Sequence, residues 1–148
     1  MNVLYPAYFE YDKKEQLYTV KFVDLPEAIT EGNNLEDAYF NASEVLTLTL
    51  EGRMEEGLEI PVPSLPQKDH ELISPSVRVQ AALLMRMAKG KNHSVAEIAR
   101  ALDTSWAAAS RLENPRHWPS LRQLERAAAS LGQEVIISLK PAHTAQSH

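Results

Sequence analysis

The sequence predicts an α+β protein of two successive parts, a small βββαβ domain followed by an all-α domain. The length of 148 residues suits one ordinary domain or two small ones, at about 100–200 residues per domain. Hydrophobic residues make up 44% and charged residues 24%, which is typical of a globular rather than a disordered chain. The spacing of apolar residues also changes, from alternation before residue 32 to helical spacing after residue 74.

Alternation of apolar and polar side chains predicts the first strands. Residues 3–11 alternate and are rich in aromatic side chains, and residues 17–23 repeat the pattern, so the two form a hairpin. A third short strand is expected over residues 27–31. Because proline cannot donate a ladder hydrogen bond, Pro6 predicts that the first strand lies at a sheet edge or bulges there.

A long helix follows, beginning after Asn34 and ending at Gly57. The Asn34 side chain can accept a hydrogen bond from the free N–H groups of the first turn. The apolar stripe expected to cover the sheet consists of Leu35, Ala38, Ala42, Val45, Leu46, Thr49 and Leu50. Residues 58–63 are predicted to form the last strand, which Pro61 and Pro63 would confine to an edge.

The prolines and charges of residues 65–74 predict a linker between a first domain, residues 1–64, and a second, residues 75–140. The helices expected in the second domain cover residues 75–90, 94–102, 105–113 and 120–131. Residues 133–140 predict a strand with no evident partner in its own domain, and residues 141–148 a disordered tail.

The second and third of these helices carry the pattern of a helix-turn-helix. Ile98 and Ala99 would pack inward, and the turn at Asp103 would lead into a helix capped by Ser105. The segment resembles the Xre/Cro-type repressor family, including the Ser110-Arg111-Leu112-Glu113 end of its second helix. It departs from that family at Asp103, where a turn glycine is usual, and at Val95, where a glutamine is usual. An ordinary helical hairpin is the alternative interpretation.

The resemblance places the second helix in the major groove of DNA. Arg111 is the best candidate to bind guanine, because a guanidinium can donate to O6 and N7 together. The residues predicted to contact bases or phosphates are Ser94, Ser105, Trp106, Ala107, Ser110, Arg111, Lys91, Asn92 and Arg116. Trp106 could equally be a packing residue, and each cation could be an ordinary solvated surface charge.

The charge is divided unequally along the chain. Residues 1–66 carry four Lys and Arg against thirteen Asp and Glu, a net charge of −9, whereas the remaining residues carry eleven against seven, a net charge of +4. This polarity suggests a cationic partner for the first domain and an anionic partner for the second.

Residues 22–46, FVDLPEAITEGNNLEDAYFNASEVL, followed by IPVPS at residues 60–64, resemble the HicB antitoxin family, and the helix-turn-helix matches one of the tails of that family. The resemblance implies a partial RNase H-like fold in the first domain. It also implies an antitoxin that masks a small basic RNA-cleaving toxin, HicA, and represses its own operon on double-stranded operator DNA. Asp24, Glu27 and Glu31 are the candidate toxin contacts, because carboxylates attract a cationic surface.

The unpaired strand predicts self-association. Its exposed edge would pair with the same strand of a second chain, giving a homodimer through Val135, Ile136, Ile137 and Leu139. Pairing of the N-terminal halves as well would give a homotetramer. Such dimers suit the two-fold operators that helix-turn-helix proteins bind.

Two other functions stay open at the level of sequence. One is a ligand-responsive transcription regulator without a toxin partner, and the other is a metal-dependent nuclease that uses the carboxylates of the first domain. We expect no catalytic residues, metal or cofactor. The chain has no cysteine and no long apolar run, so we expect a cytoplasmic protein, nucleoid-associated when bound to DNA, that does not contact a membrane.

Overall fold

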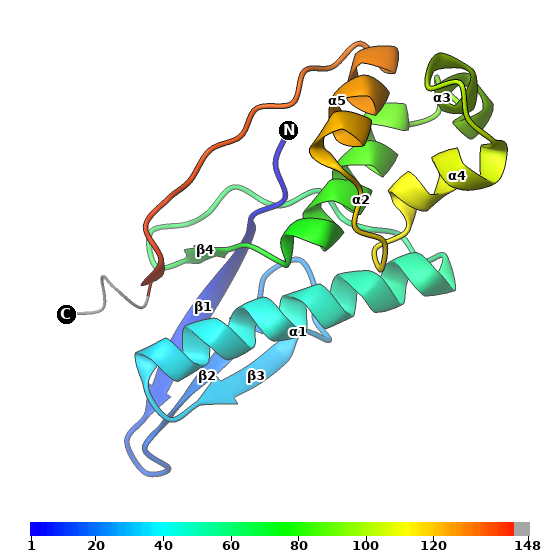
Figure 1. Cartoon of the computed structure of the whole chain (residues 1–148). Helices are drawn as coiled ribbons and strands as arrows, with labels where there is room; N and C mark the ends of the chain where they lie inside the picture. The colour runs from blue at the N-terminus through cyan, green and yellow to red at the C-terminus, as the bar shows by residue number, and fades with distance from the viewer. Residues whose placement is uncertain (144–148) are drawn as a thin grey trace. The chain divides into compact units, whose positions relative to one another are not determined.

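The computed structural model describes residues 1–143 and divides them into two compact units (Figure 1). The N-terminal unit contains Asn2–Ser76 together with the chain from Leu139 on, and the helical unit contains Val77–Ser138 together with Met1. Of the tail predicted to be disordered, residues 144–148 lie outside the described residues.

The N-terminal unit is an antiparallel sheet covered on one face by a long helix (Figure 1). Its elements are β1 Tyr5–Asp12, β2 Leu17–Phe22, β3 Ile29–Gly32, α1 Leu35–Glu56 and β4 Glu71–Ile73. The strand order is β3-β2-β1-β4, and every neighbouring pair is antiparallel. The predicted α+β class and the long helix are therefore confirmed.

The position of the fourth strand was predicted wrongly. Residues 58–63 form no strand, and β4 lies at Glu71–Ile73, within the stretch predicted to be a linker. The prolines at positions 61 and 63 cannot donate ladder hydrogen bonds, whereas β4 is free of proline and pairs with Tyr5–Ala7 of β1.

The place of β1 in the sheet also differs from the prediction. β1 is an inner strand, paired with β2 on one side and β4 on the other. Pro6 is tolerated because it lies just beyond Ala7 and Phe22, the last paired residues of the β1–β2 ladder. Its carbonyl oxygen still accepts a hydrogen bond from the Val23 N–H at 3.1 Å.

Helix α1 begins and ends where the sequence predicts. The Asn34 side chain accepts from the Asp37 N–H at 2.8 Å, and Gly57 ends the helix in the left-handed conformation. Gly32 packs so closely on Ala38 that a Cβ there would lie 2.3 Å from the Ala38 nitrogen. The largest fully buried side chains of the N-terminal unit include Val3, Tyr5, Val20, Leu25, Leu46, Leu50 and Ile73.

The helical unit contains four α-helices and one 3-10 turn in its described residues. They are α2 Val77–Lys89, α3 Val95–Ala101, α4 Trp106–Ser110, the 3-10 turn η1 Arg111–Glu113 and α5 Leu121–Ser130. The predicted helix over residues 105–113 is thus α4 followed by η1. The core that these elements share consists of Met85, Ile98, Ala99, Ala109, Leu112, Ala127, Ala128 and Leu131.

Residues 133–140 form no strand within the single described chain. Four of their apolar side chains are exposed, with fractions of 39% for Val135, 80% for Ile136, 68% for Ile137 and 98% for Leu139. Pairing of this segment with a second chain stays a prediction.

Candidate partner-binding surfaces

Helices α3 and α4 are joined by a short turn fixed by local hydrogen bonds. The Ser94 hydroxyl accepts from the Glu97 N–H at 3.2 Å at the start of α3, and the Ser105 hydroxyl accepts from the Ala108 N–H at 3.1 Å at the start of α4. Between them, Asp103 has a φ of 51°. A residue other than glycine adopts this left-handed conformation at a cost, and aspartate tolerates it better than most. The predicted turn is confirmed at this residue.

A second set of contacts holds η1 against α2. The Lys89 ammonium lies 2.8 Å from a Glu113 carboxylate oxygen, and the Arg86 Nε donates to the Glu113 main-chain oxygen at 3.0 Å. The Lys89 and Glu113 side chains are 22% and 15% exposed. Sequence reasoning identified Glu113 only as part of a family pattern, because nothing local in the sequence pairs it with α2.

The exposed side of α4 and η1 carries several of the predicted DNA-binding residues. Trp106 is 61% exposed, and Ala107 and Arg111 are exposed as well. Ser110 is half-buried, and its hydroxyl donates to the Ala107 main-chain oxygen at 3.1 Å.

The predicted phosphate-binding residues lie in two loops. Lys91, Asn92 and Ser94 are exposed in the turn between α2 and α3. Arg116 is exposed in the loop before α5, where its N–H donates to the Asn114 side-chain oxygen at 2.9 Å.

Two of the predicted toxin contacts form hydrogen bonds within the N-terminal unit. Asp24 accepts from the Ser64 N–H at 2.9 Å and from the Ser64 hydroxyl. Glu27 accepts from the Arg53 Nε at 2.7 Å and from its Nη2 at 2.9 Å, and these bonds lower the pKa of the Glu27 carboxyl. Arg53 also donates to the Glu59 main-chain oxygen at 2.9 Å.

The third predicted contact, Glu31, lies on the edge strand β3 and is exposed. Its main-chain oxygen accepts from the Asn41 Nδ2 at 2.8 Å, so α1 covers this edge group. Glu31 is therefore the most accessible of the three candidate carboxylates, since Asp24 and Glu27 already have partners in the fold.

A hydrogen bond joins residues 58–63 to strand β1 of the sheet. The buried Tyr5 hydroxyl donates to the Pro61 main-chain oxygen at 2.7 Å. Burial, reinforced by the charge of Asp24, raises the pKa of Tyr5 to about 12.

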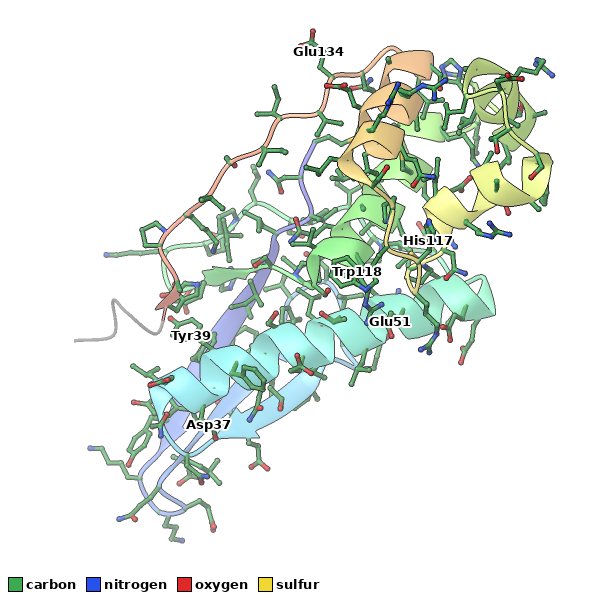
Figure 2. All side chains as sticks on the ribbon, viewed as in Figure 1. Asp37, Tyr39, Glu51, His117, Trp118 and Glu134 are labelled. Carbon is green, nitrogen blue, oxygen red and sulfur yellow. The ribbon has the colours of Figure 1, made fainter. Side chains whose placement is uncertain are left out.

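The chain returns to the N-terminal unit at its described C-terminal end. The His143 ring stacks on the Tyr39 ring of α1 with a centroid distance of 4.0 Å and an interplanar angle of 2°. Tyr39, labelled in Figure 2, also lies 4.6 Å from the Phe9 ring, centroid to centroid. Burial and the adjacent Glu71 carboxylate raise the pKa of Tyr39.

The described residues contain no group of three or more His, Cys, Asp or Glu side chains that could hold a metal ion. Within residues 1–143, no helix is both long and apolar enough to cross a membrane.

Comparison with known proteins identifies the kind of protein. A family model described as a HicB-like antitoxin of bacterial toxin-antitoxin systems matches residues 4–83. Antitoxin HicB 2 of Photorhabdus laumondii is 31% identical over 134 residues, covering 90% of this chain and 94% of the relative. Antitoxin HicB of Escherichia coli is 30% identical over 119 residues, covering 80% and 86%.

These matches place the chain among the antitoxins of bacterial toxin-antitoxin systems, and HicB antitoxins are not enzymes. More narrowly, the chain belongs to the HicB-like antitoxin family.

Proposed function

We propose that this chain binds and masks a small basic RNA-cleaving toxin of the HicA type through its N-terminal unit and represses its own operon through a helix-turn-helix. The family membership carries the toxin half of the proposal. The left-handed turn at Asp103, between capped helices α3 and α4, carries the DNA half.

Charge supports the assignment of the N-terminal unit to the toxin. Residues 1–66 have a net charge of −9, and a toxin that binds RNA needs a cationic surface. An acidic partner accelerates capture of such a surface and competes with RNA for it without any chemistry. The sheet with one long helix is consistent with the partial RNase H-like fold that the family resemblance implies. Asp24, Glu27 and Glu31 stay the sequence-predicted contacts.

The test of this half is binding and rescue. The small basic toxin encoded beside this gene is purified free, and its association with the full antitoxin is measured by calorimetry and by protection of an RNA substrate. Co-expression of the two genes should restore growth. A ligand-responsive regulator without a toxin partner would neither bind the toxin nor rescue growth, and that result would refute the toxin half.

Geometry supports the assignment of α4 to the major groove. Ala109 and Leu112 are buried in the helical core, while Trp106, Ala107 and Arg111 are exposed. This division leaves Arg111 accessible to donate to guanine O6 and N7. Lys91, Asn92, Ser94 and Arg116 are the proposed phosphate contacts, and Ser105 and Ser110 complete the proposed DNA surface.

The DNA half is tested with duplexes taken from the upstream region of its own operon and with an unrelated duplex. We expect affinity for the operator duplex to fall steeply as salt rises, because Lys and Arg displace counterions from phosphates. Arg111→Ala should weaken operator binding by about 10- to 100-fold and reduce discrimination between the duplexes. Lys14→Ala removes the same charge from the exposed β1–β2 turn and should leave binding unchanged. Equal affinities of wild type and Arg111→Ala would contradict the proposed readout.

We also propose that residues 133–140 pair with the same segment of a second chain, giving a homodimer, and that pairing of the N-terminal units as well would give a homotetramer. Four exposed apolar side chains in this segment, Val135, Ile136, Ile137 and Leu139, support a partner that covers them. The double variant Ile136→Asp with Ile137→Asp should sediment as a monomer and lose operator affinity. A variant that stays dimeric would refute this assembly.

A further inference from the structure

The outer face of α1 carries large apolar side chains among carboxylates. Glu36, Phe40, Glu44 and Leu48 are spaced four residues apart, which places them on one side of a helix. All four are exposed, with fractions of 62% for Phe40 and 65% for Leu48. We call these four residues the α1 stripe.

The α1 stripe lies opposite the packed face of the helix. The packed face of α1 has no exposed surface and lies against the sheet; it consists of Ala38, Ala42, Leu46 and Leu50. The stripe is therefore not part of the core of the N-terminal unit, and its apolar side chains contribute to stability far less than the buried ones do.

Carboxylates outnumber basic residues in the sequence of α1. Arg53 is the single basic residue in the sequence of α1, and it is bound by Glu27 and by the Glu59 main-chain oxygen. A protein interface typically combines an aromatic or aliphatic centre with a polar rim. The α1 stripe has that composition, with carboxylates as the charged part.

The sequence-predicted contact residues of the N-terminal unit are partly engaged within the fold. The edge of β3 is partly covered, since Asn41 binds the Glu31 main-chain oxygen. A partner that bound Asp24 or Glu27 would compete with Ser64 or Arg53 for their carboxylate oxygens.

We infer that the α1 stripe is the principal docking surface for the basic toxin, with Phe40 and Leu48 as the apolar anchors and Glu36 and Glu44 as its charge-complementary rim. This inference rests on the proposed toxin-binding function and specifies where on the N-terminal unit the toxin binds. The occupant is a small cationic protein with an apolar patch between its basic side chains. Charge complementarity with the −9 unit selects this occupant over a second copy of the chain, whose N-terminal unit carries the same negative charge.

The first test truncates the anchors in the full-length antitoxin. Phe40→Ala and Leu48→Ala should each weaken binding of the purified neighbouring toxin by about 10- to 100-fold, as expected for central interface residues. Alanine favours an exposed helix position, so circular dichroism and thermal unfolding should show a folded protein. Ile29→Ala is the matched control, because Ile29 is 51% exposed on β3 of the same unit. It should bind the toxin like the wild type.

The second test separates the docking surface from net charge. Glu44→Lys and Glu10→Lys change the net charge equally, and both glutamates are exposed. Both should slow association to a similar degree, but Glu44→Lys alone should accelerate dissociation, because only it alters the bound surface. The stripe variants should leave operator binding unchanged.

The outcomes distinguish the two proposals. A wild-type protein that fails to bind the toxin overturns the proposed function and this inference with it. A wild type that binds, with stripe variants that bind equally well, overturns the inference alone. The same holds if Phe40→Ala changes the sedimentation of the free antitoxin while its toxin affinity is unchanged, since a second copy would then be the occupant.

Discussion

Different kinds of contact stabilise each of the two units of this antitoxin internally. In the N-terminal unit, side chains join residues far apart in sequence: Tyr5 binds Pro61, Asp24 binds Ser64 and Glu27 binds Arg53. In the helical unit, serine caps join residues three apart, as at Ser94, Ser105 and Ser120.

The cores differ in the same way. The N-terminal unit buries large side chains such as Tyr5, Leu46 and Ile73, whereas half of the shared helical core is alanine, namely Ala99, Ala109, Ala127 and Ala128. Small side chains let short helices approach closely, and local contacts reduce the entropy lost in closing long loops. The comparison teaches that local caps and small core residues specify much of the helical unit, with the Lys89–Glu113 pair as a distant contact, while the N-terminal unit depends mainly on distant partners.

The largest expected effect tests whether the units are independent. Leu46→Ala and Ile98→Ala each remove a fully buried side chain and should each destabilise their own unit by about 2–5 kcal/mol. Hydrogen exchange read separately over residues 2–76 and 77–130 should show lost protection only in the mutated unit. Equal loss of protection in both units for either variant would contradict their independence.

A smaller effect is expected at high pH, and only in the N-terminal unit. The pKa of Tyr5 is raised from 10.0 to about 12 in the folded protein. The protonated hydroxyl therefore stabilises the folded state fully below pH 10, and this stabilisation is lost as the pH rises through 12. Two pKa units correspond to about 2–3 kcal/mol. Tyr5→Phe should remove this alkaline loss, at a cost of about 1 kcal/mol at neutral pH from the unpaired Pro61 oxygen. Tyr11→Phe, at a residue 50% exposed, is the control and should keep the alkaline loss seen in urea titrations.

Loss of the Arg53–Glu27 ion pair and loss of the Ser120 helix cap should lower the free energy of unfolding by similar amounts at neutral pH and by different amounts in acid. Arg53→Met and Ser120→Ala should each cost about 1 kcal/mol. The pKa of Glu27 is lowered from 4.5 in the folded state. The Arg53–Glu27 ion pair therefore stabilises the folded state above pH 4.5, and this stabilisation is lost as the pH falls through the folded pKa. The effect of Arg53→Met should therefore shrink as the pH falls below 4.5, and that of Ser120→Ala should not. Parallel pH dependences in urea unfolding would contradict this difference.

The smallest effect is a gain in stability in the helical unit. Asp103→Gly should stabilise it by about 0.5–1 kcal/mol, because glycine adopts a φ of 51° without the clash of a Cβ. Asp103→Val should destabilise it, since a β-branched side chain fits this conformation poorly. Thermal unfolding followed by circular dichroism measures both, and a lower midpoint for Asp103→Gly would be the contrary result.

The local contacts of both units could be predicted from sequence, and the distant ones could not. Caps at Asn34, Ser94 and Ser105 follow from residue type and the helical pattern that comes next. The strand at Glu71–Ile73 was missed because three residues carry no recognisable period, and its pairing depends on β1, more than sixty residues earlier.

The same limit applies to the candidate surfaces. Exposure of Trp106 and Arg111 follows from helical spacing, and both are exposed in the structure. The partners of Asp24 and Glu27 could not be foreseen, because carboxylates look alike in sequence whether they are free or bound. The exposed α1 stripe was missed because Phe40 and Leu48 fall outside the apolar face predicted to cover the sheet, and helical spacing does not say what an outward apolar side chain contacts.

The stacking of His143 on Tyr39 has a consequence for how the protein can be divided. Since the chain leaves the N-terminal unit after Ser76 and re-enters it at Leu139, the helical unit is an insertion rather than an appended tail. A fragment that stops at Ser76 would lack the ring that covers Tyr39 and the Lys140 ammonium 3.5 Å from the Leu72 oxygen. Exchange of the helical unit for another DNA-binding module would therefore need two junctions, one at each end of the inserted segment.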